Sequence, residues 1–232
     1  NSMIAQGPAM RDKLKRLYKI ENISIVPNAV STHNLDSFNS RDFALGDGFK
    51  LLCLSQYYSH KNLEIFINLA ELIKLNQLNW KIIITIHGEQ GVGARELLEN
   101  IKRRSLENII VNIGTVSMHD VPSLYRQCDA LLLPTLLESF SGTYVEAMYH
   151  GKPIFTSNYD FAVDVCQNSA FYFDPVNAQE IFECINIAVN NEHLIDKKVS
   201  LGKERLSMML NWNQAFDSYI ALINKLLEKD YE

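Results

Sequence analysis

Short apolar segments alternate with helical patterns or turns along most of this chain. Parallel strands need crossover helices between them, and those helices cover both faces of the sheet, so such an alternation indicates βαβ units. The segments predicted as strands span residues 50–55, 81–86, 109–113, 130–134, 153–156 and 170–173. The sequence therefore predicts an α/β fold built on a doubly wound, Rossmann-like parallel sheet.

Helical periodicity supports this prediction and continues beyond the last strand. Over residues 63–75, apolar side chains recur at the 3.6-residue period of a helix with one buried face. These side chains belong to Leu63, Phe66, Ile67, Ala70 and Ile73. After Pro175 the pattern is wholly helical, over 178–190, 194–209 and 212–227. We expect these additional C-terminal helices to wrap the side of the sheet.

Composition excludes several classes of protein. The chain has 232 residues, of which 47% are hydrophobic and 21% charged, and this is ordinary for a globular domain. Its formal charge is −5 and its Lys and Arg residues are scattered, whereas nucleic-acid binding needs clustered positive charge. No apolar run approaches the ~20 residues of a membrane span, and the N-terminus lacks the pattern of a signal peptide. We expect a cytoplasmic protein without a nucleic-acid partner.

The cysteines, histidines and glycines offer no metal or dinucleotide site by their spacing. Cys53, Cys128, Cys166 and Cys184 stand in largely apolar contexts without a Cys-x-x-Cys pair, so we expect buried free thiols and a reducing compartment. The histidines form no pair at ligand spacing, and we predict no metal site. The glycine-containing run 87–93 follows a strand, but its spacing is not that of a dinucleotide fingerprint.

Two carboxylates flank a turn between a predicted strand and a predicted helix. Residues 129–134 predict a buried strand, and residues 145–150 predict a helix that ends at Gly151. The turn lies at the carboxyl end of the strand, where the following helix directs backbone N–H groups into the crevice of a parallel sheet. Glu138 stands in the turn and Glu146 about one helical turn inside the helix, where paired acceptors suit sugar hydroxyls. For an isolated pair, a helix cap and a solvated helix residue are the simpler explanation.

The residues around this pair favour the functional interpretation. Glu138, Glu146 and the Gly-Lys-Pro run at 151–153 resemble the Glu-x7-Glu segment of retaining glycosyltransferases of family 4, the glycosyl transferases group 1. Further stretches match that family in order, at residues 26–30, 54–62, 113–116, 124–125, 128–130 and 173–175, and at Trp212. The resemblance covers roughly residues 24–225. Each motif is weak alone, whereas several in the right order are specific.

The resemblance implies a particular architecture and activity. Complete enzymes of the family have two facing Rossmann-like domains, the GT-B fold, and this chain resembles one half of it. Residues 1–30, with a basic helix over 10–20, resemble the tail and linker of an N-terminal acceptor domain. Residues 31–232 resemble the domain that binds the nucleotide-sugar donor, and the helix from Trp212 corresponds to one that runs back toward the acceptor domain.

The implied reaction is transfer of a hexose, with retention, from a UDP- or GDP-linked sugar, which is the substrate, with no cofactor. The implied acceptor is a glycan or a lipid-linked molecule held by the other domain, as in cell-envelope polysaccharide biosynthesis. The isolated donor domain is expected to be inactive alone. Peripheral association of the full-length protein with the inner face of the membrane is compatible with this assignment.

The resemblance also implies roles for individual residues. Glu138 corresponds to the catalytic-site glutamate that contacts the donor sugar near its anomeric carbon, and Glu146 to the glutamate that binds the ribose hydroxyls. Lys61 corresponds to the lysine that neutralises the leaving diphosphate, and Val116 to the loop beside the nucleobase. The backbone that cradles the diphosphate corresponds to Phe140, Ser141, Gly142 and Thr143.

Three positions depart from the family pattern. Gln56 stands where Arg is usual, and Ser55 precedes it where Gly is usual. A neutral amide can hydrogen-bond a phosphate but does not neutralise it. Either another cation serves, from His60 or from the other domain, or donor binding is weaker. Ser141 replaces the glycine that usually follows the position of Phe140, which reshapes the sugar pocket but keeps the N–H cradle.

Two other functions stay open on the sequence. A non-catalytic nucleotide-sugar binding module is the first, because of Gln56 and because the acceptor domain is expected to be missing. Another GT-B enzyme, such as an epimerase or a phosphorylase, is the second. A phosphorylase needs a lysine placed for a pyridoxal Schiff base, and no lysine in the sequence is marked out for that role.

Overall fold

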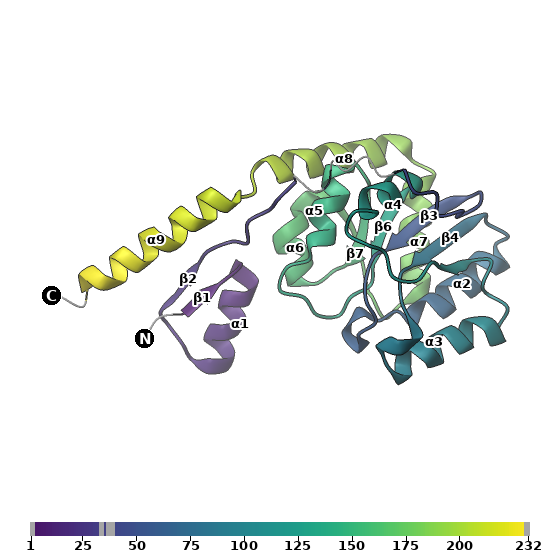
Figure 1. The fold of residues 1–232 in the computed structure, drawn as a ribbon, viewed down its shortest axis with the longest axis horizontal. Helices are drawn as coiled ribbons and strands as arrows, with labels where there is room; N and C mark the ends of the chain where they lie inside the picture. Colours follow the sequence, from purple (N-terminus) through teal and green to yellow (C-terminus); the bar gives the residue numbers. More distant parts are fainter. Residues whose placement is uncertain (1–2, 33–34, 36–39, 230–232) are drawn as a thin grey trace.

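A six-stranded, wholly parallel sheet forms the centre of the molecule (Figure 1). The computed structural model describes residues 3–32, 35 and 40–229, so the ends of both predicted domain ranges, part of the junction between them, and His33 lie outside the described residues. The strands are β3 Phe49–Cys53, β4 Trp80–Ile84, β5 Ile110–Asn112, β6 Ala130–Leu133, β7 Ile154–Ser157 and β8 Ala170–Phe173. All six predicted strands are confirmed. Each bound lies within two residues of the prediction, because a fully buried parallel strand is a continuous apolar run.

The order of the strands creates a switch point in the middle of the sheet. The order is β5-β4-β3-β6-β7-β8, so the chain builds outward from β3 to one edge and then returns to β6 and builds toward the other. Strands β3 and β6 are neighbours, with Leu51 paired to Ala130 and Leu52 to Leu131. The loops that leave these two strands diverge to opposite sides, which opens a crevice at the carboxyl edge of the sheet.

Helices cover both faces of the sheet. They are α2 Ile65–Leu75, α3 Val92–Arg103, α4 Val121–Gln127, α5 Gly142–Tyr149, α6 Asp160–Cys166, α7 Ala178–Val189 and α8 Glu192–Ser207. The apolar stripe predicted for 63–75 is confirmed, since all five of its side chains are buried. Helix α8 packs closely on α5, because a Cβ added at Gly202 would lie 3.3 Å from Met148. The four cysteines are free thiols, and three of them are buried while Cys184 is half-buried.

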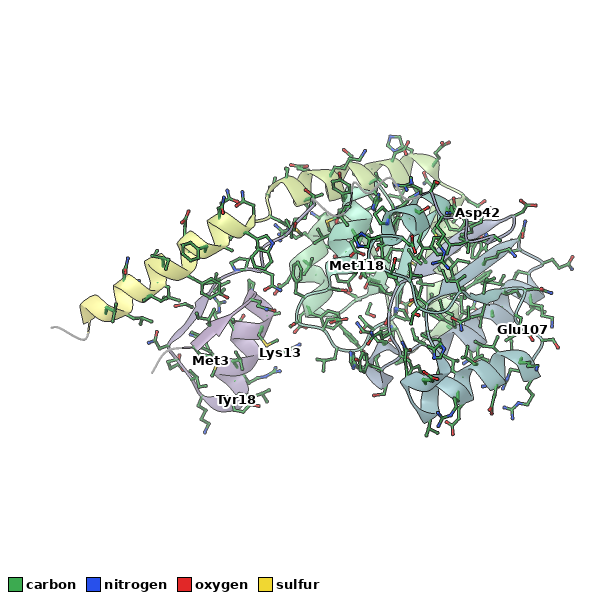
Figure 2. All side chains as sticks on the ribbon, viewed as in Figure 1. Met3, Lys13, Tyr18, Asp42, Glu107 and Met118 are labelled. Atoms are coloured by element: carbon green, nitrogen blue, oxygen red, sulfur yellow. The ribbon has the colours of Figure 1, made fainter. Side chains whose placement is uncertain are left out.

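A small N-terminal unit lies beside the sheet domain. It consists of β1 Met3–Ala5, α1 Pro8–Tyr18 and β2 Ile23–Ile25, and the two strands pair in parallel. Helix α1 confirms the basic helix predicted over 10–20. The unit docks on α6, where Asp164 Oδ2 accepts a hydrogen bond from Ala9 N at 2.7 Å and Lys13 Nζ lies 2.7 Å from Asp160 Oδ1. Figure 2 shows Lys13 directed from α1 toward the sheet domain, and Met3 and Tyr18 on the unit's surface.

The last helix departs from the expected position. Helices α7 and α8 pack on the domain, whereas α9 Trp212–Lys229 extends away from the sheet on the side of the N-terminal unit (Figure 1). The prediction that all three C-terminal helices wrap the sheet is therefore wrong for α9. Its apolar residues recur at helical spacing, but most of them, such as Trp212 and Phe216, are exposed, and among its described side chains only Ala215 is buried. Within the described residues, no helix combines the length and apolar character needed to cross a bilayer.

Candidate functional site

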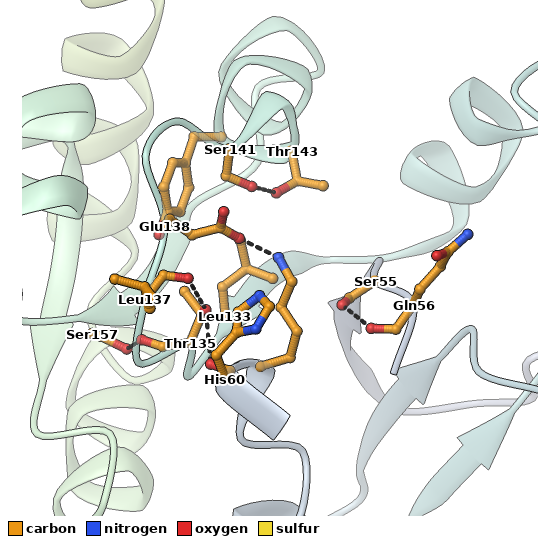
Figure 3. A network of polar contacts seen from close by, with 12 residues as sticks. Ser55, Gln56, His60, Leu133, Thr135, Leu137, Glu138, Ser141, Thr143 and Ser157 are labelled. Carbon is orange, nitrogen blue, oxygen red and sulfur yellow. Dashed lines mark hydrogen bonds and ion pairs between the residues drawn. The ribbon is translucent and has the colours of Figure 1, made fainter. Parts of the chain in front are cut away.

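An ion pair bridges the two loops of the switch point. Lys61, in the short 3-10 turn Ser59–Lys61 after β3, contacts Glu138 Oε1 with its Nζ atom, and Glu138 stands in the loop after β6 (Figure 3). The side chains are 19% and 15% exposed, so the pair is largely shielded but still reached by solvent. The structure thus brings together two residues that the sequence analysis assigned to one site.

Hydrogen bonds to backbone carbonyl groups hold these two loops together. The carbonyl oxygen of His60 accepts hydrogen bonds from Leu136 N at 2.7 Å and from Thr135 Oγ1 at 3.1 Å. The amide of Asn62 donates to Pro134 O at 3.2 Å and to Pro175 O at 2.7 Å. Asn62 has a φ of 57°, a left-handed conformation that asparagine tolerates better than most residues. The loops are therefore braced before any ligand binds.

The first turn of α5 opens next to Glu138. Phe140 and Ser141 precede the helix, and Gly142 and Thr143 begin it. Ser141 is the N-cap residue but makes no capping hydrogen bond, because its Oγ lies 2.8 Å from Thr143 Oγ1 instead. A Cβ added at Gly142 would meet nothing within 4 Å, so the space over this turn is open. Exposed N–H groups at a helix N-terminus attract anions such as phosphate.

Glu146 lies one helical turn into α5 and is half-buried. The hydroxyl of Tyr125, on α4, lies 3.1 Å from Glu146 Oε2 and 3.2 Å from Thr143 O. Burial raises the pKa of Glu146 above its ordinary value, because the charged form loses hydration, and the hydrogen bond from Tyr125 partly opposes this rise. Glu146 is thus a carboxylate held at some electrostatic cost, which is typical of functional sites.

Two of the candidate residues lie apart from this cluster. Gln56 is exposed, its Oε1 atom accepts a hydrogen bond from Tyr58 OH at 3.1 Å, and its amide points away from Glu138 in Figure 3. Val116 follows β5, two strands away from β3, and packs half-buried against the core. Lys61, Glu138, the first turn of α5 and Glu146 share the switch point, whereas Gln56 and Val116 flank it.

The sequence analysis missed the supporting residues of the site. Tyr125 and Asn62 were noted only as parts of family motifs, and Thr135 was not noted at all. A neighbouring proline and strand end mark Thr135 as a loop residue, but its contact with His60 spans 75 positions of the chain. Among the described residues, no group of three or more His, Cys, Asp or Glu side chains is placed to hold a metal ion.

A cavity of about 460 Å³ lies between the N-terminal unit and the loop of Glu138. Most of its walls are apolar, and they include Met10, Leu14, Phe140, Phe161 and Met208. Glu138 also lines it, so the cavity reaches the carboxylate that contacts Lys61. A molecule in the cavity would therefore lie next to whatever Glu138 contacts.

Sequence comparison identifies relatives with a shared activity. The family model of the glycosyl transferases group 1 matches residues 36–205. Mannosylfructose-phosphate synthase of Agrobacterium fabrum is 21% identical over 184 residues, which are 76% of this chain and 40% of that protein. The α-1,3/1,6-mannosyltransferase ALG2 of Dictyostelium discoideum is 22% identical over 231 residues, 93% of this chain and 52% of that protein. The chain thus spans only about half, or less, of these relatives.

Structural comparison agrees on the fold. A glycosyltransferase from Rickettsia africae superposes with a TM-score of 0.81 at 19% identity, over 98% of this chain and 64% of that one. Anabaena Alr3699/HepE, in a complex with UDP and glucose, superposes with a TM-score of 0.79 at 20% identity, over 96% of this chain and 62% of that one. These likenesses show the α/β fold of GT-B glycosyltransferases. With a family model that matches most of its length, the chain belongs to the glycosyl transferases group 1 family.

Proposed function

We propose that this chain is the donor-binding half of a retaining glycosyltransferase, which binds a nucleoside diphosphate sugar, UDP- or GDP-linked, at the carboxyl edge of the sheet. The observation that carries the proposal is the Lys61–Glu138 pair at the switch point, beside the first turn of α5. A cation, helix N–H groups and two carboxylates in one crevice match the diphosphate, the sugar and the ribose of such a donor.

The diphosphate would lie over the first turn of α5. There the N–H groups of residues 140–143 and the helix dipole offer attraction, and the open space over Gly142 leaves room. Lys61 lies at the same place and supplies a full positive charge. As the bond to the sugar breaks, negative charge grows on the leaving diphosphate, and a positioned ammonium stabilises that charge most where water is scarce.

The two carboxylates would bind the two sugars of the donor. Glu146 accepts hydrogen bonds from the ribose hydroxyls, and a carboxylate makes strong charge-assisted bonds to such a pair. Glu138 accepts from the hydroxyls of the transferred hexose and stabilises positive charge at its anomeric carbon. The loop at Val116 lies beside the nucleobase. In this assignment, transfer proceeds with retention of configuration.

The acceptor would bind to the other domain of the complete enzyme. The chain spans 40% of its Agrobacterium relative. A Campylobacter jejuni relative, 24% identical over 186 residues, is named for transfer to an undecaprenol-diphosphate-linked sugar. That name supports a glycan or lipid-linked acceptor. We further propose a role in cell-envelope polysaccharide biosynthesis and contact of the full-length protein with the cytoplasmic face of a membrane.

A thermal-shift panel of nucleoside diphosphates and nucleotide sugars tests the proposal. A ligand present at 100 times its dissociation constant adds ~2.7 kcal/mol of apparent stability to the native state. We expect UDP or GDP, and their sugar conjugates, to raise the melting temperature, and the free nucleosides to do so far less. If no nucleoside diphosphate stabilises the chain, the assignment of the crevice is wrong.

A binding module without catalysis is the alternative that one observation favours. Gln56 replaces the usual arginine, is exposed, and bonds Tyr58 at the edge of the site, so the diphosphate has one cation fewer in this loop. The full-length protein separates the two functions. An enzyme consumes its nucleotide sugar in the presence of acceptor, whereas a module binds it unchanged.

A further inference from the structure

Tyr125 links two helices at the heart of the crevice. It is 1% exposed, and its hydroxyl lies between Glu146 Oε2, at 3.1 Å, and Thr143 O, at 3.2 Å. Thr143 is in the first turn of α5, and Glu146 follows one turn later on the same face. A single phenol on α4 therefore contacts both the start of α5 and the carboxylate that α5 presents.

We infer that Tyr125 is a positioning residue for nucleotide binding, whose phenol holds the carboxylate of Glu146 in the orientation that accepts ribose hydroxyls. The inference rests on the proposed function. The phenol engages Oε2, which fixes the plane of the carboxylate and directs its remaining acceptor sites outward. A glutamate without this contact has several rotamers of similar energy, and ordering them would weaken ribose binding.

Electrostatics around the phenol agree with this role. Burial raises the pKa of Tyr125 well above its ordinary value, so the phenol remains a donor at all ordinary pH. Cys53 on β3 and Cys128 after α4 also act on Tyr125, and burial raises the pKa of each to about 12, so both stay uncharged. His150, at the end of α5, stacks on the Tyr125 ring with centroids 5.0 Å apart. His150 is present in every variant compared below, so it does not account for differences in affinity between them.

Tyr144 offers a matched control. It is as deeply buried as Tyr125, and its hydroxyl lies 2.7 Å from Thr156 Oγ1. Tyr144→Phe and Tyr125→Phe each remove one buried hydroxyl near α5, but only the second removes a hydrogen bond to a carboxylate. A general loss of packing or stability affects both variants, whereas a loss of positioning affects only Tyr125→Phe.

The test measures the affinity of UDP and GDP by calorimetry between pH 5.5 and 8, for the parent, Tyr125→Phe, Tyr144→Phe and Glu146→Gln. At pH 7 we expect Tyr125→Phe to bind about tenfold more weakly than the parent, and Tyr144→Phe to match the parent. Acid should weaken binding by protonating Glu146. Because the Tyr125 hydrogen bond lowers the pKa of Glu146, its loss should move this weakening to higher pH. Inorganic pyrophosphate, which has no ribose, should bind the parent and Tyr125→Phe equally.

The outcomes separate this inference from the proposed function. If the parent binds neither UDP nor GDP, the proposed function fails and takes the inference with it. If Glu146→Gln weakens binding but Tyr125→Phe leaves affinity and pH profile unchanged, only the inference fails. Equal losses in both phenylalanine variants also overturn it. The double variant Tyr125→Phe with Glu146→Gln is a second test, and the Glu146→Gln background favours folding because it removes the cost of burying the charged carboxylate. The double variant should bind as Glu146→Gln alone does, and a further loss of affinity rejects the positioning role.

Discussion

Glu146 is a carboxyl group kept largely out of water, with one phenol as its partner on α4. Its pKa is raised above the ordinary 4.5 because burial disfavours the charge. A group whose pKa is raised by folding gives stability that is fully present below its unfolded pKa and is lost as pH rises through its folded pKa. The native state therefore carries a cost at neutral pH that it does not carry in mild acid.

Glu146→Gln should remove this free-energy cost and also weaken nucleotide binding. We expect the variant to be more stable than the parent at pH 7.5 in urea unfolding, and the difference to shrink toward pH 4.5 and below. Affinity for the nucleoside diphosphate should fall about tenfold or more, because a charge-assisted hydrogen bond contributes ~1.5–3 kcal/mol. A variant that gains no stability, or binds UDP and GDP as the parent does, would contradict this role.

Because Lys61 and Glu138 form an ion pair, substitutions of the two residues should change the affinity for a nucleoside diphosphate in opposite directions. Lys61→Gln removes the cation and should weaken diphosphate binding tenfold or more. Glu138→Gln instead releases Lys61 from its partner, so UDP or GDP without a sugar should bind about two- to fivefold more tightly, in line with the ~0.2–1 kcal/mol of a partly solvated pair. Calorimetry on both variants checks the signs, and weaker diphosphate binding by Glu138→Gln would refute the release.

Sequence patterns located the charged residues of the site but not their surroundings. The resemblance to the family motifs predicted Lys61 and Glu138 in one site. The structure brings them into contact because their loops follow β3 and β6, the neighbouring strands at the switch point. The direction of the Gln56 side chain could not be predicted, because a local hydrogen bond from the hydroxyl of Tyr58 sets it. The contact of Tyr125 with Glu146 joins two helices over 21 positions, and no periodicity encodes a single hydrogen bond of that kind.

Strand and helix patterns were most reliable where an element is buried on both sides. The sheet strands were found because they are continuous apolar runs, whereas β1 and β2, with three residues each, are too short to show alternation. Helix α9 was expected against the sheet because its residues are periodic and apolar. Periodicity reports that a helix has an apolar face, and it does not report which surface covers that face.

Gly48 and Gly114 both have a positive φ, but they differ in the space available for a Cβ atom. Gly48, before β3, has a φ of 107°, and a Cβ there would lie 2.4 Å from Asn79 O, whereas Gly114, after β5, has a φ of 71° with nothing within 4 Å. Gly114→Ala should cost only the left-handed conformation, about 1–2 kcal/mol. Gly48→Ala adds a clash with backbone and should cost more. Urea unfolding of both variants checks this order. Equal losses in the free energy of unfolding would show that the backbone at Gly48 shifts to accommodate the added Cβ.

At the scale of the molecule, the N-terminal unit and α9 lie on one side of the sheet domain, and both carry exposed apolar side chains. The unit's strands β1 and β2 pair only with each other among the described residues, which is too little sheet to be stable by itself. Its polar contacts with α6 include Ala9 with Asp164 and Lys13 with Asp160. These features fit a chain that spans 52% or less of the curated relatives described above.

Residues 1–232 alone should therefore bind a nucleoside diphosphate and transfer no sugar. In the proposed function, Lys61, the first turn of α5 and the two carboxylates bind the donor, whereas the acceptor binds to the other domain of the complete enzyme. Calorimetry with UDP and GDP, together with an assay for product in the presence of candidate glycan and lipid-linked acceptors, checks both halves of the expectation. Measurable transfer by this chain alone would refute the second half.

In the proposed function, the pairing of Lys61 with Glu138 also favours a ligand that carries both a sugar and a phosphate over a ligand that carries only one of them. A free hexose meets a glutamate already neutralised by its partner, and an inorganic phosphate can draw the lysine away but offers nothing for the glutamate to hold. Only a molecule that carries both groups, joined at the right distance, satisfies each member of the pair as it separates them. The site then responds to the linkage between sugar and phosphate, which is the bond that the proposed reaction breaks.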